Sequence, residues 1–177
     1  MRLTVVYNGE EYHRLGGTWV DECNITAPAS IQRMLDRQYK DKYLCDLTSL
    51  SNEKILVEAK FFKNNGSANL ALELLKYLYD RQAFLKVVPS MLASCYRLTG
   101  KPEAAIALYE EIVSIYGHSF ATPELLTSVA AAFLDVKQAE DAKKRCDQGY
   151  AKSNGNPSDE LKSVYQRLRS EAPWLFS

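Results

Sequence analysis

Hydrophobic and polar positions change their spacing once along the chain, near residue 26. Before this point, short runs of β-branched and aromatic residues flank Asn8-Gly9, a dipeptide that favours the type I′ turn of a β-hairpin. The pattern predicts a hairpin over residues 3–14 and a third strand at Thr18-Trp19-Val20. An isolated hairpin is marginally stable in water, so we expect this segment to pack on the rest of the chain.

From residue 26 onwards, apolar residues recur every three to four positions, which is the period of an α-helix. The first stripe predicts a helix over residues 28–44 and consists of Ile31, Met34, Leu35, Tyr39 and Tyr43. The same spacing, interrupted by capping residues, glycines and prolines, predicts further helices over residues 53–64, 68–82, 88–98, 102–116, 123–135, 138–152 and 157–170. Ser67 is expected to cap the helix that follows it.

A period of 34 residues runs through the helical part of the chain. Five positions of one helix pair recur 34 residues later: Ala59, Phe62, Gly66, Ala71 and Leu75 are matched by Ala93, Tyr96, Gly100, Ala105 and Tyr109. A third copy follows a three-residue excess near Gly117, has Lys137 in place of the turn glycine, and contains Ala130, Phe133, Ala142 and Cys146. One helical hairpin cannot bury its apolar face alone, so the copies are predicted to stack.

These copies resemble the tetratricopeptide repeat family. The best copy, residues 92–111, has the family's Leu-Ala-x-x-Tyr, turn-glycine, small-residue and aromatic positions, whereas Glu58 replaces the usual leucine in the first copy. The resemblance covers residues 52–156 and implies a mainly α fold, a right-handed α-solenoid of helix–turn–helix repeats. Together with the hairpin it predicts two domains, a hairpin-plus-helix element over 1–51 and a repeat domain with a C-terminal capping helix over 52–177.

The balance of charged residues argues against two classes of binding partner, nucleic acids and anionic membranes. The chain of 177 residues carries 22 basic and 22 acidic side chains, and binding to nucleic acids or anionic membranes relies on clustered Lys and Arg. Neither partner is therefore expected, and no apolar run approaches the roughly 20 residues that span a bilayer. With no signal-peptide core and four widely spaced cysteines, we expect a cytoplasmic protein without disulfides.

Signals for catalysis are weak. The segment 117–121 has a serine between small residues, but a nucleophile elbow requires a strand before the serine, and here a helix is predicted. The basic run 143–145 has acidic neighbours and is typical of a solvated helix face. His13 and His118 lie far apart in the sequence. We predict no catalytic residue, no metal site and no cofactor.

The resemblance implies where a partner binds, because the first helix of each repeat lines a concave groove in the family. The corresponding positions form a mildly basic set that we predict to bind a peptide or partner protein: Lys60, Lys63, Ser90, Ser94, Arg97 and Thr127. The family's carboxylate clamp for chaperone C-termini is not matched, since Leu56 and Ala131 occupy two of its places. Large apolar residues outside the repeats form a second set that either closes the structure or makes an interface: Trp19, Trp174 and Phe176.

The function that these features predict is a non-enzymatic protein–protein interaction module with an adaptor, scaffold or chaperone-like role. Two alternatives stay open. One is a self-associating structural subunit, a homo-oligomer that uses the free edge of the hairpin and the apolar tail. The other is an enzyme whose site lies within residues 1–51.

Overall fold

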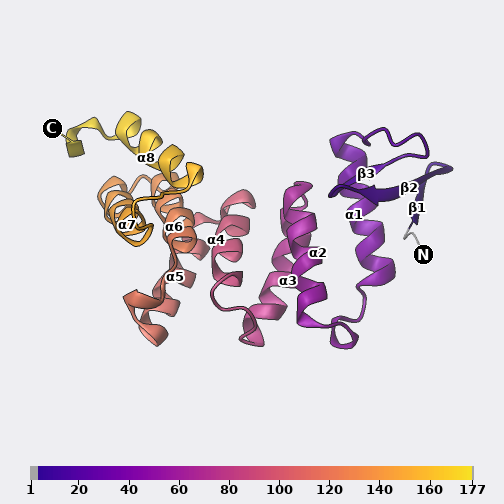
Figure 1. The fold of residues 1–177 in the computed structure, drawn as a ribbon, viewed down its shortest axis with the longest axis horizontal. Coiled ribbons are helices and arrows are strands. Elements are labelled where there is room, and N and C mark those ends of the chain that lie inside the picture. Colours follow the sequence, from indigo (N-terminus) through magenta and orange to yellow (C-terminus); the bar gives the residue numbers. More distant parts are fainter. Residues whose placement is uncertain (1–3, 177) are drawn as a thin grey trace. The chain divides into compact units, whose positions relative to one another are not determined.

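A computed structural model describes residues 4–176 of the chain (Figure 1). Its contacts divide the chain into two compact units, Met1–Arg81 (unit 1) and Gln82–Ser177 (unit 2). The predicted boundary after residue 51 falls inside unit 1. None of the helices in the described part of the chain is both long enough and apolar enough to cross a membrane.

The N-terminal residues form a three-stranded antiparallel sheet with the order β1-β2-β3. Its strands are β1 (Thr4–Tyr7), β2 (Glu10–Leu15) and β3 (Thr18–Val20). Asn8 and Gly9 both have positive φ, at 51° and 83°, as a two-residue type I′ turn requires. The predicted hairpin and third strand are therefore confirmed, while Leu3, which the hairpin prediction included, lies outside the described residues.

Helix α1 (Ala29–Tyr43) buries a more polar face than its sequence suggests. Leu35 and Tyr39 are buried as predicted, but Met34 is 45% exposed, and Gln32 and Asp36 are buried in its place. The reason is the sheet, because Trp19 on β3 brings polar groups that need partners. Its backbone N–H donates to Gln32 Oε1 over 3.0 Å and its indole Nε1–H donates to Asp36 Oδ1 over 2.7 Å.

The remaining helices agree closely with the sequence-based predictions (Figure 1). They are α2 (Asn52–Asn64), α3 (Ala68–Asp80), α4 (Val88–Leu98), α5 (Pro102–Tyr116), α6 (Pro123–Asp135), α7 (Ala139–Lys152) and α8 (Asp159–Glu171). Short 3₁₀ turns cover Leu47–Ser49, His118–Phe120 and Pro173–Phe176. Side-chain caps at Ser51, Thr122 and Ser158 satisfy backbone N–H groups at the starts of α2, α6 and α8.

The helix pairs α2/α3, α4/α5 and α6/α7 are the three predicted copies of the repeat. All six small residues at the predicted helix–helix contacts are fully buried: Ala59, Ala71, Ala93, Ala105, Ala130 and Ala142. The turns are also equivalent. Gly66 and Gly100 have φ of 80° and 73°, and Lys137 adopts the same left-handed conformation at 65° although it has a side chain. The turn of the third copy therefore has the same backbone conformation as the other two turns, although a lysine replaces its glycine.

Unit 1 contains a buried polar network that joins the sheet and α1 to the first repeat. Asp36 is fully buried and also accepts a hydrogen bond from the Ser67 hydroxyl over 2.6 Å. Ser67 is the N-cap residue of α3 as predicted, but its side chain makes no capping hydrogen bond, because the hydroxyl donates to Asp36. Burial raises the pKa of Asp36, and the hydrogen bonds from Ser67, Trp19 and Asn65 partly offset that effect.

A second buried contact in unit 1 explains the departure at Glu58. This carboxylate is 1% exposed and accepts from Arg14 on β2 over 2.6 Å and from Lys54 over 2.7 Å. The guanidinium of Arg14 lies 3.5 Å from the ring centroid of Phe61 and 3.8 Å from that of Tyr39. An acidic residue in place of leucine thus holds an arginine from the sheet among aromatic rings of α1 and α2.

Candidate functional site

The two predicted groove residues of unit 1 are accessible. Lys60 is exposed and Lys63 is partly exposed on α2. Neither lysine forms an ion pair with the described residues. They lie three positions apart, so both ammonium groups belong to one face of the helix. This face presents two positive charges that no described carboxylate neutralises.

In unit 2 the predicted groove residues are less available. Ser90 and Ser94 on α4 are partly buried, and the Ser90 hydroxyl donates to the Val87 carbonyl over 2.8 Å. Thr127 on α6 is 3% exposed, and its hydroxyl donates to the Pro123 carbonyl one turn earlier over 2.8 Å. Helix α6 is buried on nearly every side, since it packs against α4, α5, α7 and α8. Thr127 is therefore a core residue, contrary to its predicted place on a binding surface.

Arg97, which we predicted to belong to the mildly basic groove, forms an ion pair within unit 2. Its Nε–H donates to Asp135 Oδ2 over 2.8 Å, and Arg167 on α8 donates to Asp135 Oδ1 over 2.7 Å. Arg167 also pairs with Glu171 over 2.7 Å. Burial alone would raise the pKa of Asp135, but the hydrogen bonds and charges of the two arginines outweigh it and lower that pKa. The arginine thus belongs to an ion-pair network that ties α4, α6 and α8 together.

The three apolar residues predicted outside the repeats have different environments. Trp19 is fully buried and its ring contacts Tyr39 edge-on, so it belongs to the core of unit 1 and is not an interface residue. Phe176 is partly buried and packs edge-on against Tyr165 of α8 at 5.5 Å. Trp174 is 64% exposed. The tail is therefore docked through Phe176 and leaves an indole at the surface.

The serine-containing segment after α5 has no elbow geometry, because a helix precedes it. The loop is held by two lysines. Lys152 Nζ donates to the carbonyl oxygens of His118, Ser119 and Ala121 at 2.6–3.0 Å, and Lys86 Nζ donates to that of Phe120 over 3.1 Å. Burial, and then the nearby charge of Lys86, lower the pKa of Lys152. These contacts order the three-residue excess between the second and third repeats.

Residues 1–51 contain a small acidic cleft of about 300 Å³ beside the hairpin turn. It is lined by Gly9, Glu10, Glu11, Asp21, Glu22 and Cys23. Asp21 already accepts the backbone N–H groups of Cys23 and Ile25, and Glu10 accepts the Tyr12 hydroxyl over 2.6 Å, which raises the pKa of Tyr12 to about 12. Within residues 4–176, His, Cys, Asp and Glu form no group of three or more that suits a metal ion.

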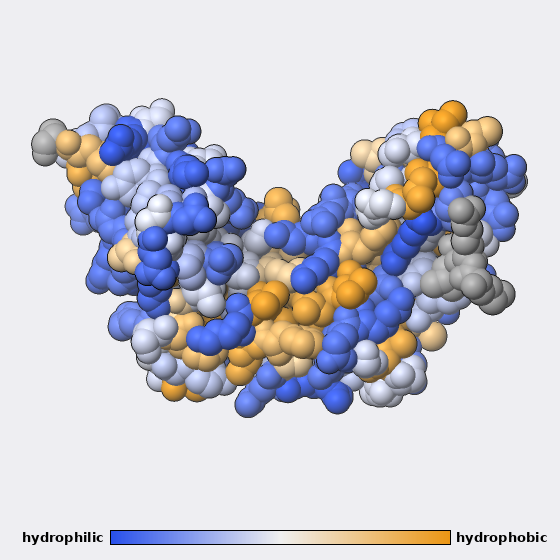
Figure 2. All heavy atoms as spheres, viewed as in Figure 1, coloured by the Kyte–Doolittle hydropathy of each residue, from blue (hydrophilic) through white to orange (hydrophobic). Residues whose placement is uncertain are grey.

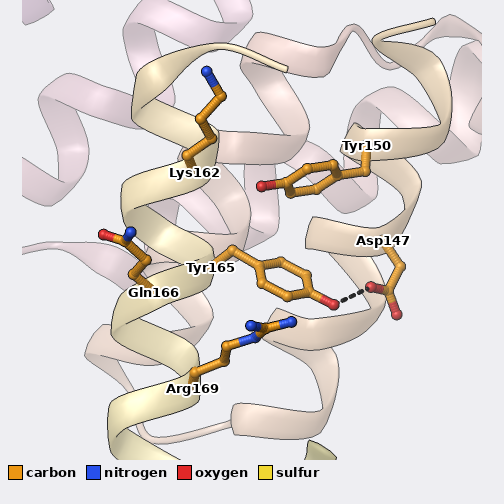
Figure 3. A pocket seen from close by; sticks show the side chains of 6 residues that line it. All are labelled: Asp147, Tyr150, Lys162, Tyr165, Gln166 and Arg169. Atoms are coloured by element: carbon orange, nitrogen blue, oxygen red, sulfur yellow. Dashed lines mark hydrogen bonds between the residues drawn. The ribbon is translucent and has the colours of Figure 1, made fainter. Parts of the chain in front are cut away.

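A larger cleft, of about 560 Å³, lies between α7 and α8 (Figure 3). Tyr150 and Tyr165 project into it from the two helices, and the Tyr165 hydroxyl donates to Asp147 Oδ1 over 3.1 Å. The two rings meet edge-on with centroids 5.1 Å apart. The other lining residues all come from α8: Lys162, Gln166 and Arg169.

This cleft is absent from the sequence-based predictions, although the sequence contains a signal for it. Asp147 and Tyr150 are three residues apart, and Lys162, Tyr165 and Arg169 recur at three- and four-residue spacing. Each set therefore lies on one helix face. Only the packing of α8 against α7 brings the two faces together.

Two solved structures are similar in fold to this chain. The tetratricopeptide repeat domain of Sgt2 from Aspergillus fumigatus superposes with a TM-score of 0.60 at 16% sequence identity, covering 69% of this chain and 79% of that one. The repeats have the tetratricopeptide fold. A thermophilic tetratricopeptide protein from Thermus thermophilus also matches at 16% identity over 82% of this chain and 84% of that one, but its TM-score of 0.49 is too low to support the assignment. No protein-family model and no curated protein matches the chain.

Proposed function

We propose that this protein is a non-enzymatic protein–protein interaction module that binds an acidic segment of a partner through the face of α2 that carries Lys60 and Lys63 (the first-helix face). The observation that carries the proposal is the pair Lys60 and Lys63, two accessible cations on α2 without a described carboxylate partner. The tetratricopeptide fold supports it, because the family resemblance implies that first helices line a groove for peptides. Ser90 and Ser94 on α4 stay predicted binding residues of unit 2 by themselves.

The proposal includes an adaptor or scaffold role in the cytoplasm, with a chaperone-like role as a narrower version. The four cysteines form no disulfide among the described residues, which agrees with a reducing compartment. The balance of 22 basic and 22 acidic side chains favours a protein partner over nucleic acid or an anionic membrane.

Charge reversal tests the proposal. We expect the double variant Lys60→Glu/Lys63→Glu to lose the partner proteins that the unmodified chain recovers in affinity purification with quantitative mass spectrometry. The matched control is Lys101→Glu/Lys144→Glu, which changes the net charge equally at two exposed lysines that are not on groove positions. Partner recovery that is unchanged in the first variant, or reduced equally in both, would refute the placement.

A second function, self-association, is favoured by one observation on the sheet. Strand β1 pairs only with β2 among the described residues and contains no charged residue, and its Val6 is 59% exposed. An uncharged edge strand is a template for pairing with another chain. Light scattering across a range of concentrations shows whether the chain is a monomer or self-associates. A dimer that the edge-blocking change Val6→Lys converts to monomer supports this function, and a monomer at every concentration eliminates it.

A further inference from the structure

The cleft between α7 and α8 contains one cation, Arg169, that has no carboxylate partner in the described part of the chain. Asp147 is satisfied twice, by Lys143 over 2.8 Å and by the Tyr165 hydroxyl over 3.1 Å. Lys162 pairs with Asp159 over 2.9 Å at the exposed start of α8. Arg169 has no carboxylate within ion-pair distance among residues 4–176. No carboxylate of the described residues therefore occupies the donors of its guanidinium.

Aromatic rings hold this guanidinium at the cleft. Its carbon lies 5.4 Å from the ring centroid of Tyr165 and 5.1 Å from that of Phe176. Contact with ring faces orients an arginine without consuming its in-plane hydrogen-bond donors. In Figure 3 the Arg169 side chain extends beneath Tyr165 towards α7. A carboxylate entering from solvent thus meets a guanidinium that is already in place.

An aromatic side chain of this protein, Phe176, already packs beside Tyr165 and shows which kind of side chain fits there. Phe176 of the tail packs on this ring with an interplanar angle of 66°, and Lys143 Nζ lies 5.6 Å from the Phe176 centroid. Tyr150 offers a second ring from the opposite wall of the cleft. Figure 2 shows that the visible surface over these C-terminal helices is mainly hydrophilic, with apolar residues near the chain end. The cleft is thus a local aromatic site within polar surroundings.

We propose that the cleft between α7 and α8 binds a short acidic peptide segment of a partner protein, with an aromatic side chain against Tyr150 and Tyr165 and a neighbouring carboxylate on Arg169. A volume of about 560 Å³ lies within the usual range of roughly 300–1,000 Å³ for ligand sites. Tyrosine and arginine are also the residues that dominate binding energy at protein interfaces. This surface is distinct from the first-helix face, because it is made by the second helix of the third repeat and by the capping helix.

A nucleic acid is the less suitable occupant. Single-stranded nucleic acids also stack on aromatic rings, but they require a groove of positive charge along the backbone. Here Asp147 pairs with Lys143 and Asp159 pairs with Lys162, so the positive charge at the cleft is partly offset. One arginine without a carboxylate partner among residues 4–176 suits a single carboxylate better than a chain of phosphates.

The test uses the full chain labelled with ¹⁵N and the probe N-acetyl-Glu-Phe-Glu-amide. We expect saturable changes in the amide resonances of α7 and α8 as the probe is titrated to about 10 mM, a range suited to a ligand of this size. Arg169→Gln should weaken binding by about tenfold, which is the typical effect of removing a charge-assisted contact. Lys144→Gln, an exposed change on α7 outside the cleft, should leave the affinity unchanged.

Two further peptides and an oligonucleotide test the chemistry of the occupant. N-acetyl-Lys-Phe-Lys-amide and N-acetyl-Glu-Ala-Glu-amide should each bind at least about tenfold more weakly than the first probe. The inference is overturned if α7 and α8 do not respond, if Arg169→Gln binds equally well, or if decathymidylate binds more tightly than the acidic peptide. The variant Lys60→Glu/Lys63→Glu should keep its affinity for the probe, so failure here is distinguishable from failure of the first-helix proposal.

Discussion

The buried carboxylate of Glu58 provides the sharpest test of how the N-terminal sheet is joined to the first repeat. The change Glu58→Leu restores the residue that is usual at this position of the resembled family, and by sequence pattern alone it should stabilise the protein. We expect the opposite. The change removes the acceptor of Arg14, Lys54 and the Tyr39 hydroxyl, which lie 2.6, 2.7 and 3.2 Å from the carboxylate.

The expected loss in the free energy of unfolding depends on which partner of Glu58 stays buried after the change. Breaking a buried ion pair by removing one member costs about 3–5 kcal/mol, because the other charge stays desolvated. The Arg14 side chain is 20% exposed, which places the loss at the lower end, about 3 kcal/mol. Lys54 is 45% exposed and regains water, so it adds little. Replacing both charges in Arg14→Met/Glu58→Leu should recover most of this loss, which corresponds to a coupling energy of about 2–3 kcal/mol.

Urea unfolding followed by tryptophan fluorescence measures these values in unit 1. Trp19 is fully buried there, whereas Trp174 is in unit 2 and 64% exposed. A Trp174→Phe background therefore makes the emission specific for Trp19. The control Lys54→Met should change the free energy of unfolding by less than about 1 kcal/mol, since exposed pairs contribute little.

The reasoning fails if Glu58→Leu is as stable as the parent chain, because the arginine would then not depend on its carboxylate. It also fails if the double variant is as unstable as the sum of its single changes. Either result would mean that the aromatic rings alone hold the guanidinium of Arg14.

Two further predictions concern unit 2. Lys137→Gly should stabilise the chain by about 0.5–1 kcal/mol in urea unfolding followed by circular dichroism, because glycine adopts positive φ without steric cost. Gly100→Lys should destabilise the chain by about 1 kcal/mol through the backbone alone, because no heavy atom lies within 4 Å of an added Cβ. If both variants are as stable as the parent chain, the backbone conformation does not have this effect. Asp135→Asn should lower the free energy of unfolding by about 1–2 kcal/mol at neutral pH, since it weakens hydrogen bonds to two arginines. Because the folded state lowers the pKa of Asp135, this difference should begin to shrink as the pH falls below about 4, the ordinary pKa of an aspartate, and should vanish once the pH lies below the lowered pKa of the folded state. A difference that does not shrink with falling pH would refute the assignment.

Much of the fold could be predicted from sequence because its signals are local. The Asn8-Gly9 turn, the helical periodicity and the 34-residue repeat each depend on residues that are close along the chain. The third repeat shows the limit of such motifs. Lys137 replaces the turn glycine, yet the turn keeps its left-handed conformation between α6 and α7, which pack against each other.

The candidate sites were harder to predict because side-chain partners are distant in sequence. Arg97 is a groove position by projection, but its carboxylate partner Asp135 lies 38 residues later. Thr127 has an accessible helix position in the pattern, and packing on several sides buries it. Composition and periodicity contain no information about either outcome.

The sequence by itself determined the elements, the repeat and the small residues that let the paired helices approach, because backbone preferences and helical periodicity are written in neighbouring residues. Only the tertiary structure decided which charged side chains form ion pairs within the protein and which have no described partner and can bind another molecule. Glu58 and Asp135 are used within the protein, whereas Lys60, Lys63 and Arg169 have no described carboxylate partner. The physical reason is that an ion pair requires two side chains to meet within 4 Å, a condition set by packing between helices and not by spacing along one of them.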